Sequence, residues 1–419
     1  MRFSKSSFGE KMSQRSGVVE LMEDLGNALT TNRSAILMGG GNPAQIPAMQ
    51  EVWRAEMASL LAEEGDRFAN VLSNYEPPAG NPAFRQALAD YLRERCGWAV
   101  GSENLAITAG GQTALFYLLN LFGGEAEDGS KRKILLPLMP EYIGYANMGA
   151  ESDCFVTQPA SIELLGENRF KYHVDFDRLK VGDEVGAICV SRPTNPSGNV
   201  LTDSEIQRLS DLSEQHEIPL IIDNAYGLPF PGVIFTEAKP FWNPNVIQTL
   251  SLSKLGLPGT RTGIVVAAPE VIEAVSAMTA VTGLANNNFG QALVHSLVES
   301  GRLDGLSRDT IQPFYRERCQ FAAEFLDSQL SGRADYRVHQ TEGTFFLWLW
   351  MENLSITSRE LYLRLKQRGV IVVPGEYFFF GLEEEWPHQT QCLRISYTQP
   401  KEAVAQGLEI IADEIIRLG

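Results

Sequence analysis

The segment around Lys254 brings together three kinds of side chain that can hold a phosphate-bearing aldehyde. The amine of Lys254 can form a Schiff base with the aldehyde. The hydroxyls of Ser251 and Ser253 and the guanidinium of Arg261 can bind the phosphate. This set favours the cofactor pyridoxal 5′-phosphate (PLP), while a solvated surface lysine in a Ser/Gly loop is the alternative for the segment taken alone.

A second candidate phosphate site follows the apolar run Leu105–Thr108. Gly110, Gly111 and Gln112 lead from this run into a helical pattern. The backbone N–H groups of a glycine turn and the N-terminus of a helix both favour an anion. An ordinary strand-to-helix turn is the alternative.

Polar residues at two further strand ends could act on the cofactor ring. Asp223 ends the run 220–223 and could keep a pyridine nitrogen protonated. Tyr226 and Asn195 could donate to the phenolic oxygen of the ring and so lower the proton affinity of the Schiff base. The alternatives are a helix N-cap for Asp223 and a plain Pro/Gly turn around Asn195.

Tyr142 and Arg394 could contact the ring and the substrate. Tyr142 follows the run Lys133–Leu138, and an aromatic side chain at this strand end can stack on the ring. Arg394 lies in an otherwise apolar run, where a bidentate bond to a substrate α-carboxylate would explain its position. A core or surface tyrosine and an internal salt bridge are the alternatives.

The elements that must position these residues alternate along the middle of the chain. Short apolar runs separated by helical patterns predict a mostly parallel sheet covered on both faces. One helical pattern, Thr202–Glu217, begins with the capping-box residues Thr202 and Glu205. In such sheets ligands bind beyond the carboxyl ends of the strands, where most of the residues above fall. The predicted strands are Leu105–Thr108, Lys133–Leu138, Gly186–Ser191, Leu220–Ile222, Val246–Leu252 and Gly263–Ala267.

The two ends of the chain predict a smaller α+β domain. The chain of 419 residues is too long for one core. We expect residues 52–301 to form a large cofactor-binding domain, and residues 1–51 and 302–419 to form the small one. Its predicted helices are Ile311–Leu330, Ser358–Arg368 and Lys401–Leu418, and its predicted strands are Thr344–Trp350, Val370–Val373 and Cys392–Tyr397.

Composition narrows the classes of partner. Lys and Arg number 35 against 52 Asp and Glu, so the net charge is −17, and no dense basic run occurs. We therefore expect neither a nucleic-acid nor a membrane partner. The five scattered cysteines and five separated histidines predict no disulfide frame and no metal site. With no signal-peptide pattern and no long apolar run, a cytoplasmic protein is expected.

Taken in order, these motifs resemble those of the fold-type I PLP-dependent aminotransferases over nearly the whole chain. The resemblance implies a seven-stranded, mostly parallel sheet in the large domain. It implies that Arg394, Asn195 and the backbone near Gly41 hold the substrate carboxylate. It also implies a homodimer in which Tyr75 reaches the phosphate of the neighbouring subunit's cofactor. The matching residues are Tyr75 and Gly80, Gly110-Gly111-Gln112, Tyr142, Asn195-Pro196-x-Gly198, Asp223-x-Ala225-Tyr226, Ser251-x-Ser253-Lys254, Arg261-x-Gly263 and Arg394.

Within that family, four local sequences are similar to those of members that transfer an amino group between valine and pyruvate. They lie at residues 39–47, 140–145, 191–196 and 223–227. The resemblance implies ping-pong conversion of L-valine and pyruvate to 3-methyl-2-oxobutanoate and L-alanine. Apolar residues at 46–47, 284–285 and 378–380 could line the side-chain pocket.

Two local features depart from the family or stay open. The loop from Lys254 to Arg261 is one residue shorter than in many members, which affects how Arg261 meets the phosphate. The peptide bond between Asn195 and Pro196 could be cis.

Other functions also fit the motifs. An aminotransferase of broad aliphatic or aromatic specificity and a PLP-dependent C–S lyase would share these residues. A non-catalytic PLP-binding regulator would need a DNA-binding segment, for which the N-terminal extension is too short. A protein that binds no cofactor is disfavoured because Lys254 and Asp223 both lie at strand ends.

Overall fold

The computed structural model describes residues 3–14, 16–31, 35–62 and 66–418. Among these residues, the larger sheet has eight strands in the order β2-β11-β10-β9-β8-β4-β3, and β5 pairs with β4 as well. The pairs from β10 to β5 are parallel, whereas β11 is antiparallel to both of its neighbours. The predicted sheet of seven strands is confirmed, and the two-residue strand β3 adds an eighth. The bounds are β2 Leu105–Thr108, β3 Gly124–Glu125, β4 Lys131–Met139, β5 Phe155–Pro159, β8 Val185–Ser191, β9 Leu220–Asp223, β10 Val246–Ser251 and β11 Gly263–Val266.

Both faces of this sheet are buried, which explains why its strands are apolar on consecutive residues. In β2, Leu105 and Ile107 belong to one hydrophobic core, and Ala106 between them belongs to the other. In β11, Ile264 and Val265 divide between the two cores in the same way. Because successive side chains in a strand point to opposite faces, a strand covered on both sides has no polar face.

Helices cover the two faces. α6 (Gly111–Phe122) packs against β10 and β11, and α7 (Asp203–Gln215) packs against β8 and β9. α7 begins with the predicted capping box, since Thr202 accepts from the backbone N–H of Glu205 and Glu205 accepts from that of Thr202. The other helices of this part are α4 Arg67–Ser73, α5 Pro82–Cys96, α8 Pro269–Gly283, α9 Asn288–Glu299 and α10 Arg302–Leu306.

A second sheet, in the order β15-β16-β13-β12-β7-β6, lies beside the first. Its hairpin of β6 and β7 comes from the middle of the chain and was not predicted. The C-terminal helices and strands lie close to their predicted positions. The strands are β6 Ser161–Leu165, β7 Arg169–His173, β12 Arg337–His339, β13 Phe346–Trp350, β15 Val373–Pro374 and β16 Cys392–Ser396, and the helices are α11 Gln312–Leu330, α12 Ser358–Gln367 and α13 Lys401–Leu418.

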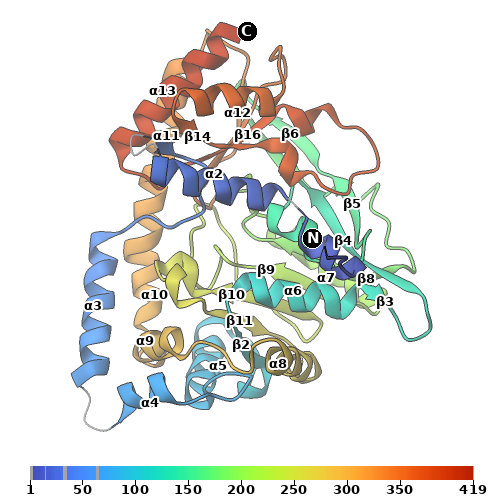
Figure 1. Cartoon of the computed structure of the whole chain (residues 1–419), viewed down its shortest axis with the longest axis vertical. Helices are drawn as coiled ribbons and strands as arrows, with labels where there is room; N and C mark the ends of the chain where they lie inside the picture. The colour runs from blue at the N-terminus through green and yellow to red at the C-terminus, as the bar shows by residue number, and fades with distance from the viewer. Residues whose placement is uncertain (1–2, 15, 32–34, 63–65, 419) are drawn as a thin grey trace.

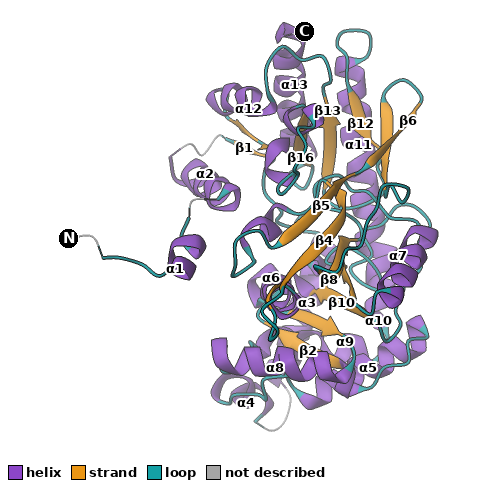
Figure 2. Ribbon diagram, turned by 90° about the vertical axis from the view of Figure 1, so that its right-hand side faces the viewer, coloured by secondary structure: helices purple, strands orange, loops and turns teal. Residues whose placement is uncertain are grey.

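The N-terminal segment forms α1, α2, β1 and α3, which precede the first strand of the large sheet. The exposed helix α1 (Ser7–Met12) extends away from the body (Figure 2). α2 (Gly17–Thr31) lies beside the C-terminal elements, and α3 (Pro47–Ala62) runs lengthwise along one side (Figure 1). Between them β1 (Ile36–Leu37) pairs with β14 (Val370–Ile371). No helix in the described part of the chain is both long and apolar enough to cross a membrane.

Candidate active site

The carboxyl ends of the parallel strands meet at one edge of the large sheet, and polar residues gather there. Ser191 at the end of β8 lies opposite Asp223 at the end of β9, which lies opposite Thr249 in β10. A cavity of about 260 Å³ opens beside them. Twelve of the predicted site residues line it: Gly41, Gly111, Gln112, Tyr142, Asn195, Asp223, Tyr226, Ser251, Ser253, Lys254, Arg261 and Arg394.

Asp223 is a buried carboxylate held by three donors. Oδ2 accepts from the hydroxyl of Tyr145 at 2.7 Å. Oδ1 accepts from the Thr249 hydroxyl at 3.1 Å and from the backbone N–H of Ala225 at 3.2 Å. Burial raises the pKa of Asp223, while these hydrogen bonds and the charge of Lys254 act in the opposite direction. The donors therefore fix the carboxylate in one orientation at the cavity.

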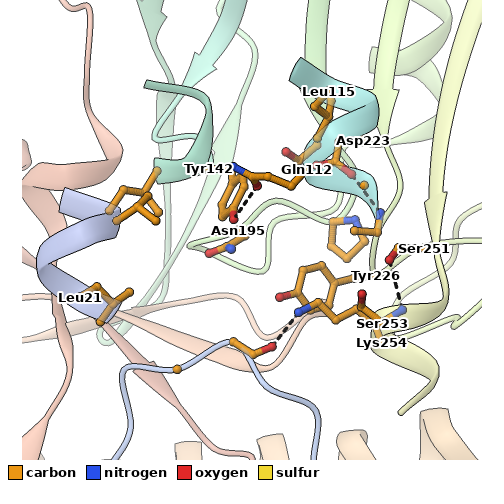
Figure 3. A pocket seen from close by; sticks show the side chains of 18 of the residues that line it. Leu21, Gln112, Leu115, Tyr142, Asn195, Asp223, Tyr226, Ser251, Ser253 and Lys254 are labelled. Atoms are coloured by element: carbon orange, nitrogen blue, oxygen red, sulfur yellow. Dashed lines mark hydrogen bonds between the residues drawn. The ribbon is translucent and has the colours of Figure 1, made fainter. Parts of the chain in front are cut away.

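Lys254 follows β10 on a short 3-10 turn, and its amine enters the cavity from there. Nζ donates to the carbonyl oxygen of Gly41 at 2.6 Å and lies 4.9 Å from the centre of the Tyr226 ring. Figure 3 shows the side chains of Lys254 and Tyr226 next to each other. Burial, together with the charges of Arg394 and Arg261, lowers the pKa of Lys254 to about 8. An amine with this pKa is available as a nucleophile and as a base near neutral pH.

The N-terminus of α6 and the turn after β10 form an end of the cavity rich in hydrogen-bond donors. Gly110 has a φ of 92°, and a Cβ there would lie 2.1 Å from Nη2 of Arg261. Only glycine therefore lets the guanidinium approach this turn. Arg261 itself adopts a left-handed backbone conformation, with a φ of 45°. The shorter loop thus still brings Arg261 to the cavity, beside Gly111 and Ser253.

Arg394 lies fully buried in β16 at the other end of the cavity. Nη1 donates to Oδ1 of Asn195 at 2.7 Å, and Nη2 donates to the carbonyl oxygen of Gly39 at 2.6 Å. The guanidinium carbon lies 4.1 Å from the centre of the Phe346 ring, and Nε has no hydrogen-bond partner among the described residues. Burial lowers the pKa of Arg394 to about 10. A guanidinium has five N–H donors, so this one retains capacity for an anion.

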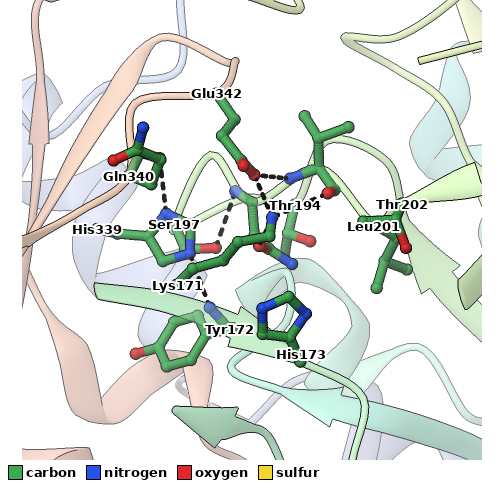
Figure 4. Close-up of polar contacts among 12 residues, drawn as sticks. Lys171, Tyr172, His173, Thr194, Ser197, Leu201, Thr202, His339, Gln340 and Glu342 are labelled. Atoms are coloured by element: carbon green, nitrogen blue, oxygen red, sulfur yellow. Dashed lines mark hydrogen bonds and ion pairs between the residues drawn. The ribbon is translucent and has the colours of Figure 1, made fainter. Parts of the chain in front are cut away.

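The loop that carries Asn195 is fixed by a buried ion pair (Figure 4). Lys171 of β7 pairs with Glu342 and donates to Oδ1 of Asn199 at 3.1 Å. Glu342 also accepts from the backbone N–H of Val200 at 2.9 Å. The unpredicted hairpin of the second sheet therefore positions a site residue. The cis peptide bond in this segment lies at Arg192–Pro193 and not at Asn195–Pro196, which corrects the alternative left open by the sequence.

The apolar wall of the cavity differs from the one predicted. It is built by Val18 and Leu21 of α2, Leu115 of α6 and Ile143, whereas residues 46–47, 284–285 and 378–380 do not line the cavity. Figure 3 shows Leu21 on the N-terminal helix, across the cavity from Leu115. This wall could not be predicted from the sequence, because the path of α2 depends on its packing against distant C-terminal elements.

Three other predicted site residues differ in their position relative to the cavity. Tyr142 lies at the cavity, and its hydroxyl donates to Oε1 of Gln112 at 3.2 Å. Gly110 does not line the cavity and instead makes room for Arg261. Tyr75 lies on the surface with 82% of its area exposed, away from the cavity of its own chain.

The donor set fits PLP. Backbone and hydroxyl donors with Arg261 gather at one end, as a phosphate requires. The buried carboxylate of Asp223 suits a protonated ring nitrogen, and Lys254 suits the aldehyde. The unpaired Nε of buried Arg394 is the kind of polar atom that a bound anion would satisfy.

Comparisons with known proteins agree with this geometry. Residues 35–411 match the family model of class I and II aminotransferases. The chain is 48% identical over 412 residues to the valine–pyruvate aminotransferase of Escherichia coli K12, which covers 98% of each chain.

Two solved structures are similar over almost the full length. A putative amino-acid aminotransferase from Psychrobacter arcticum has a TM-score of 0.96 at 41% identity, covering 100% of this chain and 99% of that one. Valine-pyruvate aminotransferase AvtA from Salmonella typhimurium has a TM-score of 0.88 at 48% identity, covering 96% and 99%. The chain therefore belongs to the class I and II aminotransferases, and it is a PLP-dependent transaminase of fold type I.

Proposed function

We propose that this enzyme transfers the amino group between L-valine and pyruvate, giving 3-methyl-2-oxobutanoate and L-alanine by a ping-pong mechanism. The observation that carries the proposal is the convergence of a buried lysine, a buried carboxylate and a buried arginine on one small cavity with an apolar wall. The similarity to relatives named for valine and pyruvate supports the choice of substrates.

Most of the polar residues at the cavity hold PLP in this proposal. Asp223 pairs with the ring nitrogen, and Tyr142 stacks on the ring. Asn195 and Tyr226 donate to the phenolic oxygen; Oδ1 of Asn195 already accepts from Arg394, so its amide nitrogen is the atom that donates. The phosphate is bound by the Gly110-Gly111-Gln112 turn, Ser251, Ser253 and Arg261.

Lys254 is the catalytic residue. When bound, PLP supplies an aldehyde that condenses with amines and a ring that withdraws electrons from the substrate α-carbon. Lys254 would remove the proton from the substrate α-carbon and deliver it to the cofactor carbon that is bonded to the same nitrogen. A single base would thus serve both proton transfers. Its lowered pKa leaves part of the amine unprotonated at neutral pH.

Arg394 holds the substrate carboxylate. Its remaining N–H groups form a fork that matches a carboxylate, and the ring of Phe346 packs against its face. Asn195 and the backbone at Gly41 complete this site. A single carboxylate-binding arginine suits a monocarboxylic amino acid.

The apolar wall sets the size of the substrate side chain. Val18 and Leu21 line the cavity with apolar side chains, which suit an isopropyl group. An apolar pocket separates side chains that differ by one methylene by only about 1–3 kcal/mol. We therefore expect 2-aminobutyrate, alanine and isoleucine to react more slowly than valine rather than to be excluded.

The proposal includes a homodimer in the cytoplasm with shared active sites. Tyr75 is exposed on its own chain and would reach the phosphate bound by the neighbouring subunit. The exposed side chains of Phe3 and Phe8 in the N-terminal arm offer further apolar surface to a partner. The five cysteines are free thiols, as in a reducing compartment.

We keep residues 52–301 as the large domain and residues 1–51 with 302–419 as the small one. The hairpin at 161–173 falls within the first range but pairs with the sheet of the second.

A product assay tests the proposed reaction. The enzyme with added PLP should convert valine and pyruvate to equal amounts of 3-methyl-2-oxobutanoate and alanine. Equal use of aromatic donors would favour an aminotransferase of broad specificity. Release of ammonia and pyruvate from cysteine, with no alanine from valine, would contradict transamination and favour the lyase.

A further inference from the structure

A second buried carboxyl group, Glu141, lies behind Asp223 and takes no part in the functions assigned above. Only 1% of Glu141 is exposed. Its Oε1 accepts from the backbone N–H of Ser191 at 2.8 Å. Its Oε2 lies 2.6 Å from Oγ of Ser191 and accepts from the backbone N–H of Tyr142 at 3.0 Å. Within the described part of the chain, the hydrogen bonds to this carboxyl all come from Ser191 and Tyr142, two residues that line the cavity.

A chain of oxygen atoms connects Glu141 to Asp223. Oγ of Ser191 lies 3.0 Å from the hydroxyl oxygen of Tyr145, and that hydroxyl donates to Oδ2 of Asp223 at 2.7 Å. All four side chains are buried. The chain thus has three oxygen–oxygen contacts in succession, each short enough for a hydrogen bond.

Counting protons decides how this chain is arranged. Ser191 and Tyr145 carry one hydroxyl proton each, so if both carboxyls were ionised, only two of the three contacts could be hydrogen bonds. One pair of oxygens would then face each other in the interior without a proton, which is costly. A third proton turns all three contacts into hydrogen bonds, which point toward Asp223 if the proton is on Glu141 and away from Asp223 if it is on Asp223.

The charges around the two carboxyls favour the proton on Glu141. The titratable groups that face it are Tyr142 and Tyr145 on its own segment, Cys189 on β8 and Asp223 on β9. Each is neutral or negative, and the positive charge of Lys254 acts on Asp223 instead. Burial, aided by the charge of Asp223 and opposed by the bonds from Ser191 and Tyr142, raises the pKa of Glu141 to about 8.

We propose that Glu141 is held as the neutral acid and starts a directional relay, from Glu141 to Ser191 to Tyr145 to Asp223, that keeps Asp223 ionised and oriented. Glu141 is thus a positioning residue. The effect of this relay on PLP binding rests on the proposed pairing of Asp223 with the ring nitrogen. The protonation of Glu141 does not depend on that pairing.

Two substitutions separate this role from that of a simple structural acceptor. The amide of Glu141→Gln can accept from the backbone N–H of Ser191 and donate to Oγ of Ser191 from the position of Oε2, so it reproduces the donor of the neutral acid and loses only the bond from the backbone N–H of Tyr142. Glu141→Ala removes the donor. We expect the alanine variant to bind PLP about 10-fold more weakly and the glutamine variant to restore the affinity. An ionised Glu141 that accepts from Ser191 predicts the reverse, with glutamine as disruptive as alanine.

Infrared difference spectroscopy on the full-length chain, with and without PLP, tests the protonation directly. At pH 6.5 the parent should show the C=O stretch of a protonated carboxylic acid that Glu141→Gln lacks and that fades as the pH rises through about 8. Glu383→Gln, a change at an exposed glutamate, is the control and should leave this band in place. Absence of the band from the parent without PLP would overturn the proposal, whatever the enzyme's substrate.

The pH dependence of stability gives an independent readout. A carboxyl whose pKa is raised on folding stabilises the fold fully below its unfolded value of about 4.5, and this stabilisation is lost as the pH rises through about 8. The melting temperature of Glu141→Gln relative to the parent should therefore rise from pH 5 to pH 9. A constant difference would contradict the proposal. If Glu141→Gln does not fold, Ser191→Ala replaces it as the test. Loss of the Ser191 hydroxyl should shift the C=O band of protonated Glu141, and an unshifted band would overturn the relay.

Discussion

Lys254, Asp223 and Arg394 acquire their chemistry from burial as much as from residue type. Burial lowers the pKa of Lys254 to about 8 and that of Arg394 to about 10, and it raises the pKa of Asp223. In each case the interior disfavours the charged form. In the proposed function, the aldehyde of the cofactor gives Lys254 a partner, its ring nitrogen gives Asp223 one, and the substrate carboxylate gives Arg394 one.

At the residue scale, Lys254→Ala should lower kcat for transamination by at least about 10²–10⁴-fold, because the base that moves the α-proton is lost. Lys180→Ala, at an exposed position, is the matched control and should retain activity. Steady-state alanine formation measures both. Turnover near the parent's in Lys254→Ala would contradict the assignment.

Arg394→Lys should raise KM for valine by about 10–100-fold, because one ammonium cannot replace a bidentate fork worth about 1.5–3 kcal/mol per charged hydrogen bond. The absorption band of bound PLP should stay unchanged if Arg394 binds the substrate carboxylate, as proposed, and not the phosphate. Loss of PLP with an unchanged KM would show that Arg394 serves the cofactor instead.

Most of the site could be predicted because its polar residues lie at or shortly after the ends of apolar strands, as Asp223 does at the end of β9, or interrupt an apolar strand, as Arg394 does in β16. What the sequence did not reveal depends on tertiary packing. Leu21 reaches the cavity only because α2 folds back across the C-terminal part. Nothing in the sequence singled out Glu141 and Tyr145, because their link to Asp223 runs between strands.

At the element scale, α2 contributes an apolar wall of the cavity. Glu20 pairs with Arg359 and accepts from Tyr377 at 2.8 Å. One turn later, Asp24 pairs with Lys366 and accepts from Tyr362. These contacts fix the helix so that Leu21 faces the cavity.

Leu21→Ala should enlarge the side-chain site and shift specificity toward bulkier donors. We expect kcat/KM for valine relative to that for leucine to fall by about 10-fold. Val19→Ala, on the same helix but 41% exposed and outside the cavity wall, is the control and should leave this ratio unchanged. If the ratio of kcat/KM for valine to that for leucine were the same in Leu21→Ala as in Val19→Ala, Leu21 would have no part in substrate selection.

The start of α7 gives a pH-dependent stability prediction. Burial alone would raise the pKa of Glu205, but hydrogen bonds from His173, Thr202 and Val174 lower it to about 2. Its contribution, up to about 3 kcal/mol, is therefore present above pH 4.5 and is lost as the pH falls through about 2.

Glu205→Gln should accordingly reduce the free energy of unfolding at pH 7, and the difference from the parent should narrow toward pH 2. Urea unfolding at several pH values measures this. A deficit that does not change with pH would show that the charge of Glu205 contributes nothing.

The elements themselves were predicted unevenly. The large sheet followed from apolar runs, and α7 from its capping box. The hairpin of β6 and β7 was missed because β6 is partly exposed along its whole length and carries no strong apolar pattern. The packing of that hairpin against β12 is a long-range contact that local sequence does not encode.

At the scale of the whole molecule, the site draws on residues from Val18 to Arg394, so it requires almost the complete fold. The wall from α2, the strand ends of the large sheet and β16 of the second sheet meet only when both sheets are assembled. Tyr75 remains outside this assembly in a single chain.

Tyr75→Phe tests whether the active sites are shared. In a dimer, loss of one hydrogen bond to a charged phosphate should weaken PLP binding by about 10–100-fold. Sedimentation should show that the variant is still a dimer, which separates this effect from loss of assembly. Unchanged PLP affinity in an intact dimer would contradict the role of Tyr75.

The most direct test of the central claim is the absorption spectrum of the purified enzyme as substrates are added one at a time. The band of lysine-bound PLP should disappear on addition of L-valine alone and return on addition of pyruvate, because each substrate completes one half of the reaction. A band that ignores valine but responds to another amino acid would overturn the proposed substrate. A protein that shows no band even with added PLP would contradict the assignment of Lys254 and of the cavity around it.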